Sequence, residues 1–291
     1  MSVLDWIRLS RFRLNYLIAI MCGIALSQQF SLSTFILVLT FSYSALFYGV
    51  FVNFVHDYGS DKMNPSMKMY AHVSGKIPLD KIKNLSRVFL AVTIMTGIVL
   101  GLIRNNFLFI ILLVWAIHCG FSYSSPPLRL KRFWWGGIVT YTFSTAVIFL
   151  TSALAFGAND LLLITLSVFV FWFGSLSVWA LTHISDKKFD RKNQVVTPAM
   201  KFGLSKALVL HNSFLFISSI FAILVSVLFL KMWWIFSPFI ATMILSYLWG
   251  KSIIGERDLG VLRKRAHTFG VAPYWLNISF LTMVYALGIV V

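Results

Sequence analysis

Long apolar stretches alternate with short polar segments along most of this chain. Many of these stretches reach the length that a helix needs to span a bilayer, about 17–25 residues. The pattern therefore predicts an all-α polytopic membrane protein, a bundle of about nine transmembrane helices. The predicted spans cover residues 14–29, 33–58, 87–103, 107–124, 135–156, 161–185, 207–230, 232–250 and 271–290.

The loops between these spans are alternately short and long, and the long ones carry the charge. Of the 25 Lys and Arg residues, 23 lie in the N-terminal segment and the long loops, and only Arg104 and Lys231 lie on the other side. Because positive loops stay on the cytoplasmic side, the long loops are predicted to be cytoplasmic and the C-terminus to lie outside. The expected location is the cell (inner) membrane.

Composition supports a membrane protein with one domain. The 291 residues are 59% hydrophobic and 12% charged, whereas soluble domains carry about 25% charge. The net charge of +16 fits membrane orientation and anionic lipids better than nucleic acid. Cys22 and Cys119 both fall inside predicted spans, so no disulfide is expected. Residues 1–291 are taken as one domain, with a pseudo-repeat of about 10–130 and 135–265 before a last helix.

Two pairs of aspartates close two of the spans. Asp57 and Asp61 follow one apolar run, with Asn53 one turn earlier, and Asp186 and Asp190 follow another. Residues four apart share one helix face, so each pair presents oxygens in one direction. Hard oxygen ligands suit Mg²⁺, which usually also takes substrate phosphates. The pairs therefore predict a phosphorylated ligand held through Mg²⁺, although ion pairing with neighbouring basic residues such as Lys62 and Arg191 stays an alternative.

Basic residues that suit an anionic ligand lie in a loop after the fourth span. Pro126 and Pro127 end the helix, and Arg129 and Lys131 then alternate with leucines, so both can project toward an anion. Each of these residues taken singly has a simpler interpretation as an orientation signal or a lipid headgroup contact. Further candidates for the anion are Arg11, Lys62 and Lys68.

These motifs together resemble the UbiA superfamily of intramembrane prenyltransferases. That family has an Asn-Asp-x-x-Asp-x-x-x-Asp motif, a Tyr-Ser-x-Pro-Pro-x-x-x-Lys loop and an Asp-x-x-x-Asp motif, in that order. The matching residues here are Asn53, Asp57, Asp61, Tyr123, Ser124, Pro126, Pro127, Lys131, Asp186 and Asp190. The resemblance covers nearly the whole chain, and three motifs in order on nine spans are far more specific than one.

The resemblance implies a helical bundle around a central cavity that opens to the cytoplasmic side and to lipid. It implies Mg²⁺ ions bound by the four aspartates and Asn53, which hold the diphosphate of an allylic isoprenoid. Tyr123 and Ser124 would then contact the substrate, as would the basic residues of the loop. The isoprenoid tail would lie in an apolar groove among the helices.

The chain departs from the family pattern at three positions. Phe54 stands where the family has an aspartate directly after the Asn of the first motif, and Gln194 replaces a glycine after the second motif. The Arg-Pro that precedes Ser74-Gly75 in the family is missing, so Lys68 or His72 is a candidate substitute for that arginine. These departures affect the acceptor and the outcome of the reaction more than the fold.

Two further residues share the helix face of Asp186. Trp179 lies two turns before it and is a candidate for lining the cavity beside a substrate carbocation, because aromatic faces attract cations. His183 is a candidate hydrogen-bonding partner or base for an acceptor. Ordinary helix packing explains Trp179 equally well, and an interior histidine with satisfied hydrogen bonds explains His183.

The leading interpretation is a Mg²⁺-dependent prenyltransferase that moves an allylic isoprenyl group from its diphosphate to an aromatic or lipid acceptor. Two alternatives remain at this point. One is a terpene cyclase of the same fold, which would act without an acceptor. The other is a transporter of an anionic metabolite, although transporters usually place charge or broken helices near mid-membrane, whereas the motif charges here lie at one boundary.

Overall fold

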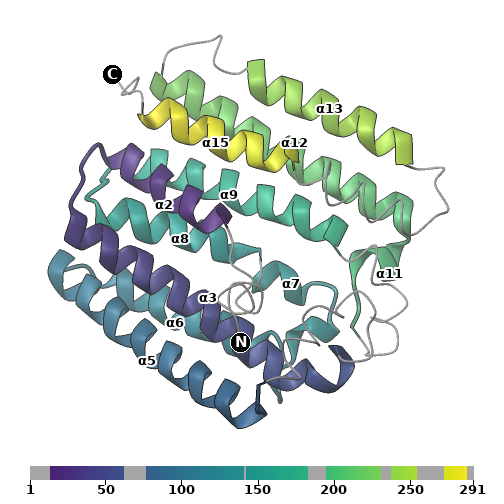
Figure 1. Cartoon of the computed structure of the whole chain (residues 1–291). Coiled ribbons are helices and arrows are strands. Elements are labelled where there is room, and N and C mark those ends of the chain that lie inside the picture. The colour runs from purple at the N-terminus through teal and green to yellow at the C-terminus, as the bar shows by residue number, and fades with distance from the viewer. Residues whose placement is uncertain are drawn as a thin grey trace. The chain divides into compact units, whose positions relative to one another are not determined.

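The computed structural model describes residues 14–61, 77–140, 142–182, 195–230, 237–253 and 272–286. The regular structure in these ranges is helical, and no strand occurs in them, which confirms the predicted all-α class (Figure 1). The chain forms two compact units. One consists of Met1–Leu17 with Ser31–Tyr141, and the other of Ile18–Phe30 with Thr142–Val291.

The first unit is built on the long helix α3 (Leu32–Asp61). Helices α5 (Leu79–Arg104) and α6 (Leu108–Ser122) both pack along it and against each other, and the three lie together in Figure 1. The 3₁₀ helix η2 (Leu130–Arg132) and the short helix α7 (Gly136–Val139) follow α6. Helix α3 therefore contacts both of the other long helices of this unit.

Close packing between α3 and α6 depends on two glycines that face each other. A Cβ atom added to Gly120 would lie 2.7 Å from the ring of Tyr48 and 3.3 Å from the Cα of Gly49. Small residues at such crossings let two helix backbones approach closely, which is the usual way that membrane helices associate. The α3–α6 contact in turn fixes where the chain after α6 begins.

Replacing Gly120 by alanine is therefore expected to lower the stability of the fold, by about 1–3 kcal/mol, the usual cost of overpacking. Gly101→Ala in α5 is the matched control, because an added Cβ there meets ordinary contacts at 3.5 Å or more and alanine favours a helix over glycine. Thermal unfolding in detergent measures both. A Gly120→Ala protein that unfolds no earlier than Gly101→Ala would contradict this account of the crossing.

A small apolar cluster anchors the end of α3 that leads to Asp57. Phe51 and Phe54 of α3 pack with Ile77 and Ile82, which lie just before α5 and in its first turn. All four side chains are less than a tenth exposed. The cluster fixes one face of α3, and the face with Asn53 and Asp57 is consequently held in a defined direction.

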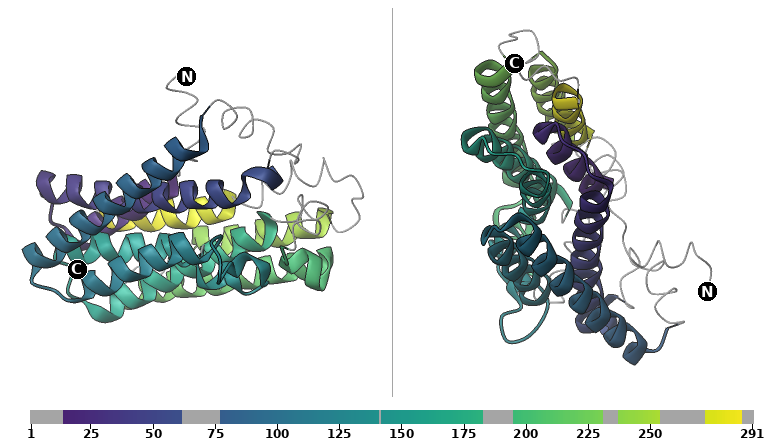
Figure 2. Two further views of the ribbon diagram at one scale, coloured as in Figure 1. Left: turned by 90° about the horizontal axis from the view of Figure 1, so that it is seen from below. Right: turned by 90° about the vertical axis from the view of Figure 1, so that its left-hand side faces the viewer.

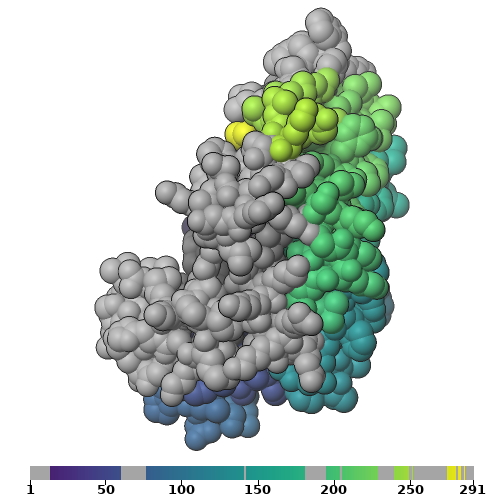
Figure 3. All heavy atoms as spheres, turned by 90° about the vertical axis from the view of Figure 1, so that its right-hand side faces the viewer, coloured from purple at the N-terminus to yellow at the C-terminus, as the bar shows by residue number. Residues whose placement is uncertain are grey.

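The second unit contains α8 (Phe143–Ala155), α9 (Leu161–Thr182), α11 (Pro198–Phe202), α12 (Leu204–Leu230), α13 (Ser237–Ile253) and α15 (Ala272–Ala286). Most of α2 (Leu14–Ser27) also belongs to it. Helices α9 and α12 run side by side, as the views of Figures 1 and 2 both show, and α13 packs on α12. On the face drawn in Figure 3, α12 and α13 form adjoining bands. Both helices have large apolar side chains that are exposed, such as Phe216 and Leu248, as expected of helices in lipid.

Buried hydrogen bonds connect the helices of the second unit. His211 of α12 contacts the Ser177 carbonyl of α9 at 2.9 Å and the Ser246 hydroxyl of α13 at 3.2 Å. Asn277 of α15 accepts a hydrogen bond from Thr242 of α13 at 2.7 Å. Such polar contacts join helices for which lipid provides little hydrophobic driving force.

Each of the nine predicted spans overlaps a helix, but two of them differ from the prediction. Helix α5 begins at Leu79, eight residues before the predicted start at Arg87, because its first two turns carry exposed polar residues that hydropathy does not detect. The range 135–156 holds two helices, α7 and α8, rather than one. Within the described residues, five helical ranges are long and apolar enough to cross a membrane, so the number nine stays a prediction.

Candidate active site

The described part of the site begins with one face of α3. Asn53 and Asp57 lie one helical turn apart, and the carboxylate of Asp57 is buried, with 7% of the residue exposed. His56, the neighbour of Asp57 in sequence, is exposed. A buried carboxylate needs partners that compensate its lost hydration, and these partners come from the chain after α6.

The segment from Tyr123 to Arg132 folds back on itself. The Arg129 N–H donates to the Ser125 carbonyl at 2.8 Å, and the Lys131 N–H donates to the Tyr123 carbonyl at 3.1 Å. Pro126 and Pro127 form the turn between these bonds. The two ends of the segment are therefore adjacent, so Ser124 and Lys131 reach α3 together.

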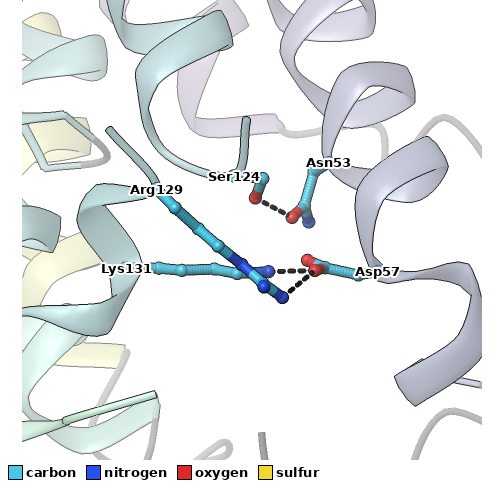
Figure 4. Close-up of polar contacts among 5 residues, drawn as sticks. All are labelled: Asn53, Asp57, Ser124, Arg129 and Lys131. Atoms are coloured by element: carbon cyan, nitrogen blue, oxygen red, sulfur yellow. Dashed lines mark hydrogen bonds and ion pairs between the residues drawn. The ribbon is translucent and has the colours of Figure 1, made fainter. Parts of the chain in front are cut away.

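Three polar contacts join this segment to α3 (Figure 4). The Ser124 hydroxyl donates to Oδ1 of Asn53, and the Lys131 ammonium donates to Oδ1 of Asp57. The Arg129 guanidinium lies 3.7 Å from the same Asp57 oxygen. Figure 4 shows both cationic side chains reaching toward Asp57 from the loop, so one aspartate faces two positive charges.

Arg129 has an unusual backbone and an unused donor. Its φ of +39° and ψ of +54° place it in the left-handed region, which costs a residue with a side chain about 1 kcal/mol or more and is common at functional sites. Its Nε is buried and has no hydrogen-bond partner among the described residues. A buried donor without a partner calls for an explanation such as a bound ion or water, and an anionic ligand is one group that would satisfy it.

The chemistry of these residues fits a divalent cation in part. A carboxylate and an amide oxygen on one face are the hard donors that Mg²⁺ takes. Among the described residues, however, no group of three or more His, Cys, Asp or Glu residues occurs. The remaining ligands of such an ion would have to be water, a substrate phosphate, or carboxylates whose side chains lie outside the described ranges.

Comparison with known proteins assigns the family. The model of the UbiA prenyltransferase family matches residues 16–286. The chain belongs to this family. No curated protein sequence matches it, but solved structures with the same fold do.

Three of these UbiA-type structures illustrate the likeness. A structure of digeranylgeranylglyceryl phosphate synthase is 17% identical with a TM-score of 0.68, covering 99% of this chain and 97% of its own. A UbiA homologue from Archaeoglobus fulgidus bound to DMAPP and Mg²⁺ is 20% identical with a TM-score of 0.70, covering 94% and 99%. An apo UbiA homologue from Aeropyrum pernix K1 is 17% identical with a TM-score of 0.67, covering 94% and 95%. At these identities the likeness establishes the fold.

Family membership gives the position of Phe54 a physical meaning. The aspartate that directly follows the Asn in the family motif would stand there, but Phe54 is 3% exposed and packs into the apolar cluster at the end of α3. An aspartate at this position of the present chain would be buried among phenylalanine and isoleucine side chains at a high desolvation cost. The substitution thus belongs to the core of the first unit, while Asn53 and Asp57 of the same helix contact the segment after α6.

The structure brings together five of the residues predicted from the sequence: Asn53, Asp57, Ser124, Arg129 and Lys131. Tyr123 joins them through its backbone carbonyl. Trp179 is buried in α9 of the second unit, and its role at the site stays a prediction. The predicted residues Arg11, Lys62, Lys68, His183, Asp186 and Asp190 lie outside the described residues, as does the side chain of Asp61.

The partners of Asp57 differ from those expected from the sequence. Arg129 and Lys131 were expected to face an anionic ligand, and the simplest alternative paired Asp57 with basic residues close in sequence. In the structure the partners of Asp57 come from 72 and 74 residues further along the chain. The shared family motif is the only signal in the sequence that connects these two segments.

Proposed function

We propose that the protein is a Mg²⁺-dependent intramembrane prenyltransferase that moves an allylic isoprenyl group from its diphosphate to an aromatic or lipid acceptor. The observation that carries this proposal is the buried Asp57 with Lys131 and Arg129 on one oxygen, in a chain of the UbiA prenyltransferase family. Structures of the same fold contain DMAPP or GPP together with Mg²⁺, which supports the choice of donor and metal.

In this mechanism Asp57 is a metal ligand, and Asp61, Asp186, Asp190 and Asn53 are its proposed companions. Bound Mg²⁺ would neutralise charge on the diphosphate, so that the allylic C–O bond can ionise. Lys131 and Arg129 contribute further positive charge to the leaving diphosphate as that bond breaks. The hydrogen bond from Ser124 to Asn53 holds the loop, and with it the side chains of Lys131 and Arg129, against α3.

Residues outside the described contacts complete the proposal. Tyr123 and the basic residues Arg11, Lys62 and Lys68 are proposed to contact the diphosphate end of the substrate. Trp179 is proposed to shield the allylic cation, and His183 to hydrogen-bond the acceptor. The substrates are proposed to enter from the membrane, with the motif loops on the cytoplasmic side and the C-terminus outside.

Lipid analysis by mass spectrometry tests this function directly. Purified protein is incubated with Mg²⁺, prenyl diphosphates of several lengths and a panel of aromatic and lipid acceptors. We expect a product that contains the prenyl group joined to one acceptor class, formed only when Mg²⁺ is present. A cyclised hydrocarbon formed without any acceptor would instead show a terpene cyclase, and uptake of intact diphosphate into sealed vesicles without a product would show a transporter.

A further inference from the structure

Two basic side chains contact the carboxylate that is proposed to bind the metal. The side chains of Asp57 and Lys131 are only 9% and 7% exposed, and the Lys131 ammonium contacts Asp57 directly. The guanidinium of Arg129, 25% exposed, lies 3.7 Å from the same oxygen. A buried carboxylate without compensating charge is strongly unfavourable. Lys131 and Arg129 therefore supply the positive charge that a bound metal would otherwise supply.

We propose that Lys131 and Arg129 are an exchangeable counter-ion of Asp57. They neutralise the carboxylate when no metal is bound, and they transfer to the substrate diphosphate when Mg²⁺ binds Asp57. This inference rests on the proposed function, because it takes Asp57 as the metal ligand and a diphosphate as the anion. It goes beyond that function by stating that metal and diphosphate bind cooperatively through one shared set of charges.

The exchange follows from the geometry of the shared oxygen. Mg²⁺ lies about 2.0–2.1 Å from its carboxylate ligands, so an ion on this oxygen would be within a few ångströms of the Lys131 ammonium. Like charges so close together in a buried, poorly screened place repel strongly. Metal binding to Asp57 therefore opposes the ion pairs, and the ion pairs oppose metal binding.

The loop allows the side chains to move while its backbone stays in place. The Ser124–Asn53 hydrogen bond and the two backbone bonds of the turn do not involve the charged ends of Lys131 or Arg129. Lys131 carries three donors, and Arg129 has an Nε donor without a partner among the described residues. The non-bridging oxygens of a diphosphate can accept from these donors, so the cations keep partners in both states.

Two binding measurements on the purified protein in detergent test the exchange, and neither requires turnover. The first is calorimetric titration with Mg²⁺ alone, where Lys131→Met is expected to bind the metal about tenfold more tightly than the wild type. The second is titration with inorganic pyrophosphate in the absence of metal, where Asp57→Asn is expected to bind pyrophosphate about tenfold more tightly. Each factor corresponds to one charge-assisted hydrogen bond that no longer competes.

An exposed ion pair in the same unit provides the matched control. Lys83 and Asp80 lie 3.5 Å apart at the start of α5, with 46% and 89% of their side chains exposed. Lys83→Met and Asp80→Asn remove the same charges, and they are expected to change either affinity less than twofold, because exposed charges are screened. Equal gains in these controls would mean that net charge, not exchange, causes the effect, which overturns the proposal.

The remaining outcomes also decide the question. Arg129→Gln tests the same exchange if Lys131→Met does not fold, and it should tighten Mg²⁺ binding in the same direction. The exchange is overturned if Lys131→Met or Arg129→Gln binds Mg²⁺ no more tightly than the wild type, and Asp57→Asn binds pyrophosphate no more tightly. Prenyl transfer would still be possible in that case. Tighter binding in all three supports the exchange even if no transferase product is found, so failure of the proposed function is distinguishable.

Discussion

Asp57→Asn is expected to lower kcat for prenyl transfer by about a thousandfold. The amide keeps the size and one oxygen of the carboxylate but loses the charge that holds a divalent ion. The lost metal contribution to neutralising the leaving diphosphate is worth several kcal/mol in the transition state. Initial rates of product formation at saturating prenyl diphosphate and Mg²⁺ measure the effect.

The matched control for this variant is Asp80→Asn, which removes the charge of an acid that is 89% exposed and paired only with Lys83 among the described residues. We expect that control to keep wild-type rates. Retention of more than a tenth of the wild-type rate by Asp57→Asn, in a protein with a normal unfolding temperature, would show that Asp57 is not a metal ligand for the reaction.

Lys131→Met is expected to lower kcat/KM for the prenyl diphosphate by about a hundredfold. Methionine preserves most of the side-chain length but removes the ammonium group that supports charge developing on the diphosphate, and loss of one such group typically costs about two to three orders of magnitude. The fall should appear mainly in kcat, because the charge on the diphosphate grows as the C–O bond breaks.

Lys83→Met serves as the control for Lys131→Met, since Lys83 is about half exposed and pairs with Asp80 rather than with Asp57. Its rates should match those of the wild type. If Lys131→Met changed only the unfolding temperature and left kcat/KM intact, the ion pair with Asp57 would be structural, and the role of Lys131 in transfer would have to be abandoned.

Hydropathy predicted the helical class, and each predicted span overlaps a described helix, because lipid-facing and core-facing residues are both apolar in a membrane protein. It failed at two kinds of places. The start of α5 was placed too late, since Asp80, Lys81 and Lys83 lie on exposed faces of a helix that continues beyond its apolar part. The break between α7 and α8 was missed, because the hydroxyl-bearing residues around Thr140 and Thr142 carry no charge and leave the whole range apolar enough to cross a membrane.

Local sequence indicated which described side chains share a face, but not which of them would pair. Spacing on one helix shows that Asn53 and Asp57 share a face, and alternation suggests that Arg129 and Lys131 point the same way. The contact of Lys131 with Asp57 depends on the α3–α6 crossing at Gly49 and Gly120 and on the hydrogen-bonded turn. Neither of these is a property of local sequence, so the counter-ion arrangement required the structure.

In the proposed reaction, Asp57 and a divalent metal together release diphosphate from an isoprenoid donor. Release of labelled pyrophosphate from a prenyl diphosphate by the purified protein tests it most directly, with and without a chelator and with Asp57→Asn alongside. We predict release that requires Mg²⁺, is lost on chelation, returns when Mg²⁺ is restored, and is nearly absent in Asp57→Asn. Release that continues unchanged in the chelator, or in Asp57→Asn, would contradict the account.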